Sequence, residues 1–365
     1  MRPPPVSQRS VLTCVLFTLG LSAASADPIP RFPPDSVWNQ DVSTAPLNTN
    51  STNMISHTAL DAWGQHFYID FPFYVLHATA GTQTDPVVAK VSYPQPDCDA
   101  PGFAFPLPAG GGMSGTGPPF GGGTAPSYAC SGDCYLLVVS GTTLYESFTS
   151  NVSAGTLQSG CALTWDLSKV YPHQGRGEQC VSTVQSGTPI APLLFNADEM
   201  YAAAQITHGD LGHAIRFLLN NAKQGVYVHP GSDGYGSDSS VDAIPMGSRL
   251  RLRADFPVDT FIAGNLASSG PQASVSAQVL LRTLQKYGMI LVDNGSVPLT
   301  AESDYYTTHK WAESGMDPVT QGGIALLETV QITDFEVVYT GEPITTTFNC
   351  ARVADDFVFI DGYDY

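Results

Sequence analysis

The stretch TLYESFTSNVSAGTLQSGCALTWDLS, from Thr143 to Ser168, contains two short apolar runs that each include a single acidic residue. Glu146 lies in the first run and Asp166 in the second. Because side chains alternate between the two faces of a strand, Glu146 shares a face with Leu144 and Phe148. Both runs therefore predict β-strands, and each acid either points to water or lines a site.

Similar runs, rich in β-branched and aromatic residues, recur on both sides of this stretch and predict further strands. They are HFYIDF, FYVLHAT, VVAKVSY, YLLVVS, HAIRFLL, VYVHP, SRLRLRA and FEVVYT. Segments rich in Gly and Pro, such as PLPAGGGMSGTGPPFGGGTAPS, lie between them and are typical of irregular loops. Short strands joined by such loops indicate a mainly β chain.

Two segments have helical character instead. Apolar residues recur at helical spacing in SVSAQVLLRTLQKYG, which begins at Ser274, and a glycine ends the run. The segment NADEMYAAAQI, from Asn196 to Ile206, is a weaker candidate. We therefore predict an antiparallel β-sandwich, jelly-roll-like, with one or two packed helices.

The charge balance is strongly acidic. The chain has a formal net charge of −18, and no basic run stands out in its 365 residues. Such a chain repels nucleic acid and anionic membrane surfaces, so we expect neither as a partner. A neutral substrate, or one bound at acidic pH, fits this balance better.

The N-terminus has the pattern of a signal peptide. Arg2 and Arg9 precede the apolar run VLTCVLFTLGL, and SAASA then offers small residues for cleavage after Ala26. We expect residues 1–26 to be removed, residues 27–340 to form a single β-rich domain and residues 341–365 to form a C-terminal tail. The mature protein would be secreted or periplasmic, without a membrane anchor.

Cleavage would remove Cys14 and leave six cysteines, which in an exported chain predict up to three disulfides. Sequence alone does not separate the many pairings that six cysteines allow. Closeness along the chain favours these pairs: Cys130–Cys134, Cys161–Cys180 and, by elimination, Cys98–Cys350. The CSGDC spacing has no second pair of zinc ligands near it, so zinc is disfavoured.

Several blocks resemble, in the same order, blocks of exported proteins of soil bacteria. They include FPPDSVWNQDVS, CALTWDLS, TPIAPLLFNADE, GHAIRF, YGMILVDNGS and TDFEVV. That set of proteins is largely uncharacterised and is sometimes joined to carbohydrate-binding modules. The resemblance implies one domain across residues 32–338 and assigns no catalytic residue. FIDGYD, near the C-terminus, resembles the F-x-D-G-F-E tails of exported gammaproteobacterial proteins.

The acids point to glycoside hydrolysis, which requires one carboxyl group as proton donor and another as nucleophile or base. Glu146 follows Tyr145 and Asp166 follows Trp165, and an aromatic ring beside an acid is suited to stack on a sugar. Asp293, at the end of an apolar run in LVDNGS, is a third candidate acid.

The stretch GHAIRFLLNNAKQGVYVHPG supplies further candidates. His213 is a candidate catalytic residue, because an imidazole among apolar neighbours can serve as acid or base. Arg216, Tyr227 and His229 are candidate substrate-binding residues. A metal bound by His213 and His229 would need a third ligand, which the sequence does not identify.

Other readings remain open. Three acids in GSDGYGSDSSVD offer oxygens for calcium, although their spacing differs from an EF-hand: Asp233, Asp238 and Asp242. A lyase would use His213 or a tyrosine as base and Arg216 to neutralise a uronate. We therefore predict a secreted enzyme that cleaves a polysaccharide, most simply a glycoside hydrolase. The alternative is a non-catalytic β-sandwich that binds carbohydrate or another surface partner.

Overall fold

The computed structural model describes Met1 and residues 29–353, apart from 60–66, 68, 91, 119–123, 264–265, 297–298 and 317–323. Residues 2–26 of the predicted signal peptide and the FIDGYD stretch lie outside the described residues. Strands make up 27% and helices 17%, so the chain is mainly β, as the sequence predicts.

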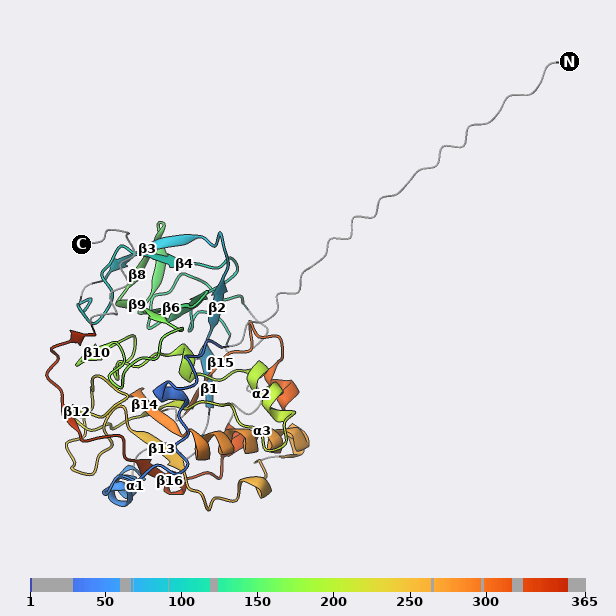
Figure 1. Cartoon of the computed structure of the whole chain (residues 1–365). Helices are drawn as coiled ribbons and strands as arrows, with labels where there is room; N and C mark the ends of the chain where they lie inside the picture. Colours follow the sequence, from blue (N-terminus) through green and yellow to red (C-terminus); the bar gives the residue numbers. More distant parts are fainter. Residues whose placement is uncertain are drawn as a thin grey trace.

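A mixed six-stranded sheet forms the lower half of the molecule (Figure 1). Its strands, in spatial order, are β1 (Ile69–Phe73), β15 (Leu299–Glu302), β11 (Ile215–Leu219), β14 (Met289–Asn294), β13 (Arg249–Leu252) and β16 (Phe335–Val338). Neighbours β1 and β15 run parallel, as do β11 and β14, and the other neighbours are antiparallel.

Helices cover one face of this sheet. The described helices are α1 (Ser51–Thr58), α2 (Ala197–Ala204), α3 (Leu266–Lys286) and α5 (Ile324–Leu327). The predicted helices are confirmed as α2 and α3, although α3 begins eight residues before the expected Ser274. Along α3, Leu280 and Leu284 pack with Leu250 and Met289 of the sheet in one hydrophobic cluster. Short 3-10 turns lie at Val37–Asn39, Ala191–Leu193, Val258–Thr260, Trp311–Ser314 and Ile332–Asp334.

Two four-stranded sheets lie on the other face and form the upper half (Figure 1). The middle sheet has the order β2 (Val75–Ala78), β5 (Leu136–Ser140), β6 (Thr143–Phe148) and β9 (Cys161–Asp166). The outer sheet has the order β4 (Ala104–Pro106), β3 (Thr84–Ala89), β8 (Thr156–Ser159) and β7 (Asn151–Ser153).

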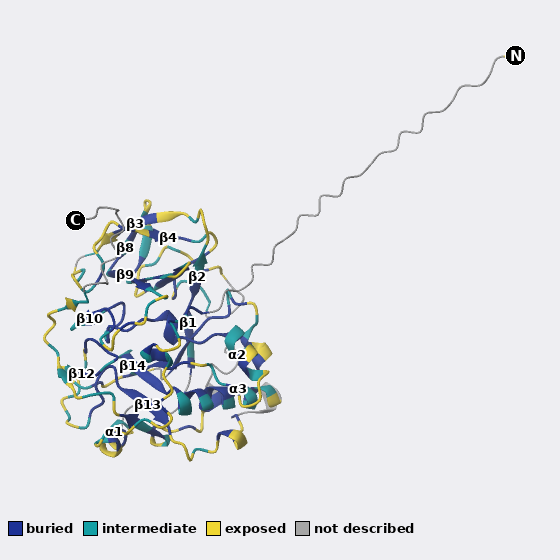
Figure 2. Ribbon diagram, viewed as in Figure 1, coloured by how far each residue is buried: buried dark blue, intermediate teal, exposed yellow. Residues whose placement is uncertain are grey.

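The middle sheet is buried on both faces. In β5, Leu137 belongs to the cluster shared with the six-stranded sheet, whereas Leu136 and Val138 belong to the cluster shared with the outer sheet. A strand between two layers must be apolar on both sides, which explains the uninterrupted LLVV run. Figure 2 shows this distribution, with the central strands buried and the exposed residues in loops and on outer helix faces.

The expectation of a purely antiparallel sandwich needs correction. Strands β2 and β5 run parallel, as do β3 and β8, in addition to the parallel pairs of the six-stranded sheet. Parallel neighbours require crossover connections, and the crossovers here carry the chain between layers. The helices and the six-stranded sheet also add layers that a two-sheet sandwich does not have.

Residues 341–353 pair with the domain, although we expected them in a separate tail. Strand β17 (Ile344–Thr345) pairs with β12 (Val226–Tyr227), and β18 (Ala351–Arg352) pairs with β10 (Gly177–Glu178). A disulfide joins Cys180 to Cys350 between these two strand pairs. The segment is therefore fastened along one side of the molecule.

The disulfides are Cys98–Cys161, Cys130–Cys134 and Cys180–Cys350. The local pair Cys130–Cys134 is confirmed, and the other two predicted pairings are wrong. Cys161 starts β9 at the middle sheet, where the loop before Cys98 also packs, so tertiary proximity outweighs closeness in sequence. No helix in the described part of the chain combines the length and apolar character needed to cross a membrane.

We expect the purified mature protein to contain these three disulfides and no free thiol among the six cysteines that follow the predicted cleavage site. Proteolysis without reduction, followed by mass spectrometry, should recover linked peptides for Cys98–Cys161 and Cys180–Cys350. A linked peptide that joins Cys161 to Cys180 would contradict the structure.

Candidate functional site

Glu146 is completely buried and its carboxylate accepts hydrogen bonds from four donors. Oε1 accepts from the backbone N–H groups of Ile190 (2.7 Å) and Ala191 (3.0 Å). Oε2 accepts from Trp165 Nε1 (3.2 Å) and Thr183 Oγ1 (3.1 Å). Burial raises the pKa of Glu146, and these hydrogen bonds oppose that rise. The carboxylate thus links β6 to the segment that leads into α2.

Asp166 lies on the opposite face of the same sheet. In the pairing of β6 with β9, Glu146 lies opposite Leu163, so these two side chains share one face of the sheet. Asp166 comes three residues after Leu163, and an odd spacing along a strand places its side chain on the other face. Asp166 Oδ1 accepts from the backbone N–H (2.9 Å) and hydroxyl (2.6 Å) of Ser168 in the turn after β9. The two acids do not converge on a cleft, which corrects the prediction that they flank a sugar.

The aromatic neighbours of these acids are not a stacking platform either. Trp165 has no exposed surface and packs edge-to-face against Phe32 and Tyr171. Tyr145 is half-buried and packs against Phe105 of the outer sheet. Trp165 and Tyr145 therefore serve the interfaces between layers, and the predicted sugar contacts at these residues are corrected.

Replacing Glu146 with Gln should lower the free energy of unfolding. One side-chain oxygen becomes an NH₂ group that faces donors, and each buried donor left unpaired costs about 1–3 kcal/mol. Urea unfolding of the variant and the parent measures this loss.

Asp166→Asn is the matched control. Its side chain caps a partly exposed turn, so the change in stability should stay within about 0.5 kcal/mol. Equal, small effects of the two substitutions would show that Glu146 does not fasten the layers.

His213 is buried and has two hydrogen-bond partners. Nδ1 donates to the carbonyl oxygen of Ala214 (2.7 Å), so Nε2 is left to accept from Arg31 Nη2 (2.7 Å). Arg31 also donates to Glu199 Oε1 (2.6 Å). Burial and the charge of Arg31 hold the pKa of His213 well below 6.5. His213 therefore stays neutral within the core, which corrects its predicted role at a substrate.

The neutral state of His213 makes stability depend on pH. In the unfolded chain this imidazole binds a proton below its ordinary pKa of 6.5, whereas in the folded chain it does not. The folded state therefore loses stability as pH falls below that value, by about 1.4 kcal/mol per pH unit at most. His213→Gln should be less stable near neutrality and should lose less on acidification, as measured by unfolding from about pH 7.5 to about pH 5. Parallel curves for the two proteins would contradict this assignment.

A different set of polar residues gathers where the C-terminal segment crosses the domain. Glu178, on β10, accepts a hydrogen bond from the hydroxyl of Tyr227 on β12. It also accepts from His229 Nε2 at 3.2 Å, and the ring of His173 stacks on His229 with centroids 6.3 Å apart. The side chain of Glu178 is 35% exposed and that of His229 is 26% exposed, so solvent reaches both.

Asp233 completes this set, which we call the Glu178 cluster: Glu178, Tyr227, His229, His173 and Asp233. Burial raises the pKa of Asp233 to about 6, and the nearby charge of Asp97 adds to the rise. Burial likewise raises the pKa of Tyr227, with contributions from Glu178 and Asp233. The structure therefore brings together Tyr227 and His229, two of the predicted substrate-binding residues.

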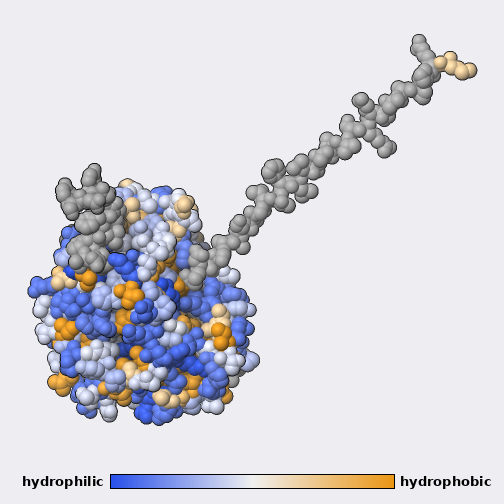
Figure 3. Space-filling view, in the orientation of Figure 1, coloured by the Kyte–Doolittle hydropathy of each residue, from blue (hydrophilic) through white to orange (hydrophobic). Residues whose placement is uncertain are grey.

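Exposed aromatic rings lie beside the cluster. Tyr235 and Phe348 are 58% and 56% exposed, and their ring centroids are 5.2 Å apart. The side chain of Gln179 links the segment that carries Phe348 to the cluster. It accepts a hydrogen bond from the backbone N–H of Thr347 (2.6 Å) and donates one to Tyr227 Oη (3.0 Å). Figure 3 shows a largely hydrophilic face of the molecule on which hydrophobic residues form only small groups.

The backbone around the cluster is closely packed. Gln179 (φ 62°) and Phe348 (φ 58°) adopt left-handed conformations, which non-glycine residues rarely adopt and which are enriched at functional sites. At Gly247, an added Cβ would lie 1.8 Å from the carbonyl oxygen of Val228, so only glycine lets these segments meet. Arg176 forms an ion pair with Asp99 and thereby holds the loop that carries Asp97.

The predicted calcium ligands do not converge. Asp233 belongs to the Glu178 cluster, Asp238 accepts from His57 Nε2 (2.6 Å) and Asp242 accepts from Asn50 Nδ2 (2.9 Å). Within the described residues, no group of three His, Cys, Asp or Glu side chains is placed to hold a metal ion. The structure offers no calcium site from this loop.

Arg216 and Asp293 do come together, on β11 and β14, at the interface between the six-stranded and middle sheets. Burial raises the pKa of Asp293 to about 6, although the charge of Arg216 opposes this rise. They lie with Tyr135, outside the Glu178 cluster.

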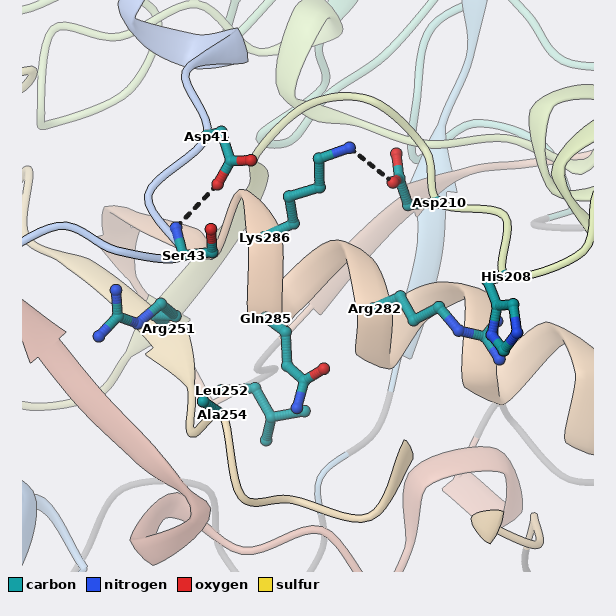
Figure 4. Close-up of a pocket in the computed structure, with 10 residues that line it drawn as sticks. All are labelled: Asp41, Ser43, His208, Asp210, Arg251, Leu252, Ala254, Arg282, Gln285 and Lys286. Atoms are coloured by element: carbon teal, nitrogen blue, oxygen red, sulfur yellow. Dashed lines mark hydrogen bonds and ion pairs between the residues drawn. The ribbon is translucent and has the colours of Figure 1, made fainter. Parts of the chain in front are cut away.

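Three cavities in the described part of the chain lie elsewhere, and one of them, of about 340 Å³, lies between the end of α2 and α3. Another, of about 360 Å³, runs beside the end of α3, and its cations are already paired with acids, as Lys286 is with Asp210 at 3.0 Å (Figure 4). The third, of about 820 Å³, lies by the turn after β2, and its lining includes His77, Gln83 and Tyr128. The lining of the third cavity includes no acid, and Asp210 and Asp259 of the other two are paired with Lys286 and Arg282, so the Glu178 cluster is the better candidate for catalysis.

Comparison of the chain with protein-family models, with curated proteins and with solved structures finds no match. The resemblance to exported soil-bacterial proteins therefore stays a prediction.

Sequence reasoning missed Glu178 and His173. Both lie in the loop segment VYPHQGRGEQC, which has neither strand periodicity nor a motif. One signal was present, because Glu178 is two residues from Cys180, and a disulfide there fixes the backbone that presents the acid.

Proposed function

We propose that the protein is an exported glycoside hydrolase that cleaves a polysaccharide at the Glu178 cluster. One observation carries the proposal: a solvent-accessible carboxylate, held by Tyr227 and His229, lies in a cluster with a second carboxyl group that keeps its proton to about pH 6. Glycoside hydrolysis requires two carboxyl groups, one of which acts as the proton donor.

The environment assigns the two roles. Asp233 is the proton donor to the leaving oxygen, because burial and Asp97 favour its protonated form. Glu178 is the nucleophile or base, because its side chain is open to solvent and is oriented by hydrogen bonds from the Tyr227 hydroxyl and His229 Nε2. His229 also fixes the direction of the Glu178 side chain, and the stacked ring of His173 supports His229.

In this proposal, exposed aromatic rings beside the Glu178 cluster bind the substrate. The exposed rings of Tyr235 and Phe348 provide apolar surface for sugar faces beside the acids. A lyase is less well supported here, because a base beside a uronate needs a neighbouring cation, and the charged groups around Tyr227 include Glu178 and Asp233. A raised pKa also makes Tyr227 a poor base.

Export is part of the proposal. The N-terminal pattern and the three disulfides support an oxidising compartment outside the cytoplasm. The two four-stranded sheets enclose one hydrophobic cluster, which supports a sandwich arrangement for that half of the chain.

We expect Glu178→Gln and Asp233→Asn to reduce turnover about 10²–10⁴-fold, the usual contribution of a general acid or base. Reducing-end assays on plant, fungal and bacterial polysaccharides provide the measurement. Activity of the parent should fall as pH rises through about 6, since Asp233 must carry a proton to act as the donor.

Asp166→Asn is again the control, because this acid lies in a turn outside the cluster. Full activity in both cluster variants would place the site elsewhere. Polysaccharides that bind without being cut, with binding lost on removal of Tyr235 or Phe348, would favour the non-catalytic binding protein instead.

A further inference from the structure

A cavity of about 820 Å³ opens in the upper half of the molecule, by the turn between β2 and β3 and the end of β4 (Figure 1). Its volume lies within the range of about 300–1,000 Å³ that is usual for small-molecule sites. Thr79, Gln83 and Ala109 in its lining are exposed, so a ligand can reach it from solvent. No residue of the Glu178 cluster is part of this lining, so the cavity is a separate candidate site.

One part of the lining is apolar and aromatic. Leu107 is buried in the hydrophobic cluster between the middle and outer sheets, and Tyr128 and Val152 pack against that cluster. The hydroxyl of Tyr128 donates to the carbonyl oxygen of Pro108 (2.6 Å), which holds the ring in place. A fixed aromatic ring with aliphatic neighbours provides a surface for the apolar C–H face of a sugar.

The other part of the lining is polar and comes from residues 77–83. It includes the hydroxyls of Thr79 and Thr82 and the amide of Gln83, groups that both donate and accept hydrogen bonds. A tight turn fixes them. The backbone N–H of Thr82 donates to the carbonyl oxygen of Thr79 (3.0 Å), and the N–H of Thr79 donates to Thr82 Oγ1 (2.9 Å). Groups that are already in place cost less to order when a ligand binds.

The charge of the lining narrows the class of ligand. Among the described residues that line this cavity none is Asp, Glu, Lys or Arg, although the chain has 33 acidic residues. The other two cavities contain both acids and cations. An ionic ligand would lose hydration here without gaining an ion-pair partner of any of these four types. A neutral sugar, with hydroxyl groups around an apolar ring face, matches both parts of the lining.

We infer that this cavity binds a short stretch of a neutral oligosaccharide without cleaving it. No carboxyl side chain among the described residues of the lining can serve as proton donor or nucleophile, so the site adds binding and not a second hydrolysis. A non-catalytic site of this kind holds a polysaccharide chain against the protein. The inference does not depend on the proposed hydrolysis, because it needs only the cavity and its lining.

Calorimetric titration of the mature protein with cellotetraose, maltotetraose and mannotetraose tests the inference. At least one of these neutral probes should bind, and tetragalacturonate, which has a carboxylate on each sugar, should bind about tenfold or more weakly. The same titrations on Tyr235→Ala, which lacks an exposed ring beside the Glu178 cluster, assign to the cavity any binding that this variant keeps. Absence of binding by all three neutral probes, or tighter binding of tetragalacturonate, would overturn the inference.

Variants locate the binding. Ala109→Trp places a large side chain at an exposed position of the lining and should abolish the binding that Tyr235→Ala keeps. Ala202→Trp, at an exposed position of α2 outside the cavity, is the matched control and should leave binding unchanged. Tyr128→Ala should weaken binding about tenfold, because the stacking surface is lost.

If Ala109→Trp does not fold, Gln83→Ala replaces it and should weaken binding about three- to tenfold, the effect of one lost hydrogen bond. In Glu178→Gln, cleavage should be lost and this binding kept, so the failure of one proposal is distinguishable from the failure of the other. Binding that is unaffected by the substitutions in the cavity, or that is lost in Tyr235→Ala, would overturn the assignment.

Discussion

The buried carboxylate of Glu146 is the interaction on which the arrangement of layers depends. It projects from the middle sheet and accepts hydrogen bonds from the segment that leaves that sheet and enters α2. A buried carboxylate is costly unless every lone-pair direction is used, and here four donors meet that condition. The layers can therefore come together in one register, because any shift would leave the charge and its donors unpaired.

The Glu178 cluster lies at the edge of this core. The two meet at Tyr227, whose ring packs in the hydrophobic cluster of the six-stranded sheet and whose hydroxyl donates to Glu178. The cluster also depends on the C-terminal segment, which pairs with β10 and β12 and is bonded to Cys180. Strand pairs and a disulfide therefore hold the Glu178 cluster at the edge of a rigid core, an arrangement typical of proteins in which loops carry function.

The acidic side chains of this protein differ in how far they are buried. Glu146 and Glu199 lie in the core with nearby donors, and burial raises their pKa values. Glu302 is also buried, and its pKa rises to about 8. By contrast, Glu178 is partly exposed and faces an imidazole and a phenol. A net charge of −18 alone would not distinguish these acids, because the charge count is the same for a buried and a partly exposed carboxylate.

The sequence by itself determined the strands, because alternation in runs such as TLYESF and ALTWDL depends only on local side-chain geometry. It likewise determined most of α3, although Gly270 and Pro271, which have low helix propensity, concealed where the helix begins. Of the predicted site residues, Tyr227 and His229 lie together beside Glu178, and Arg216 and Asp293 lie together elsewhere. Only the tertiary structure decided which face of each strand is buried, which cysteines pair, and that Glu178 meets His229. These contacts join residues far apart in the chain, and their energies arise only when layers come together, so no local pattern encodes them.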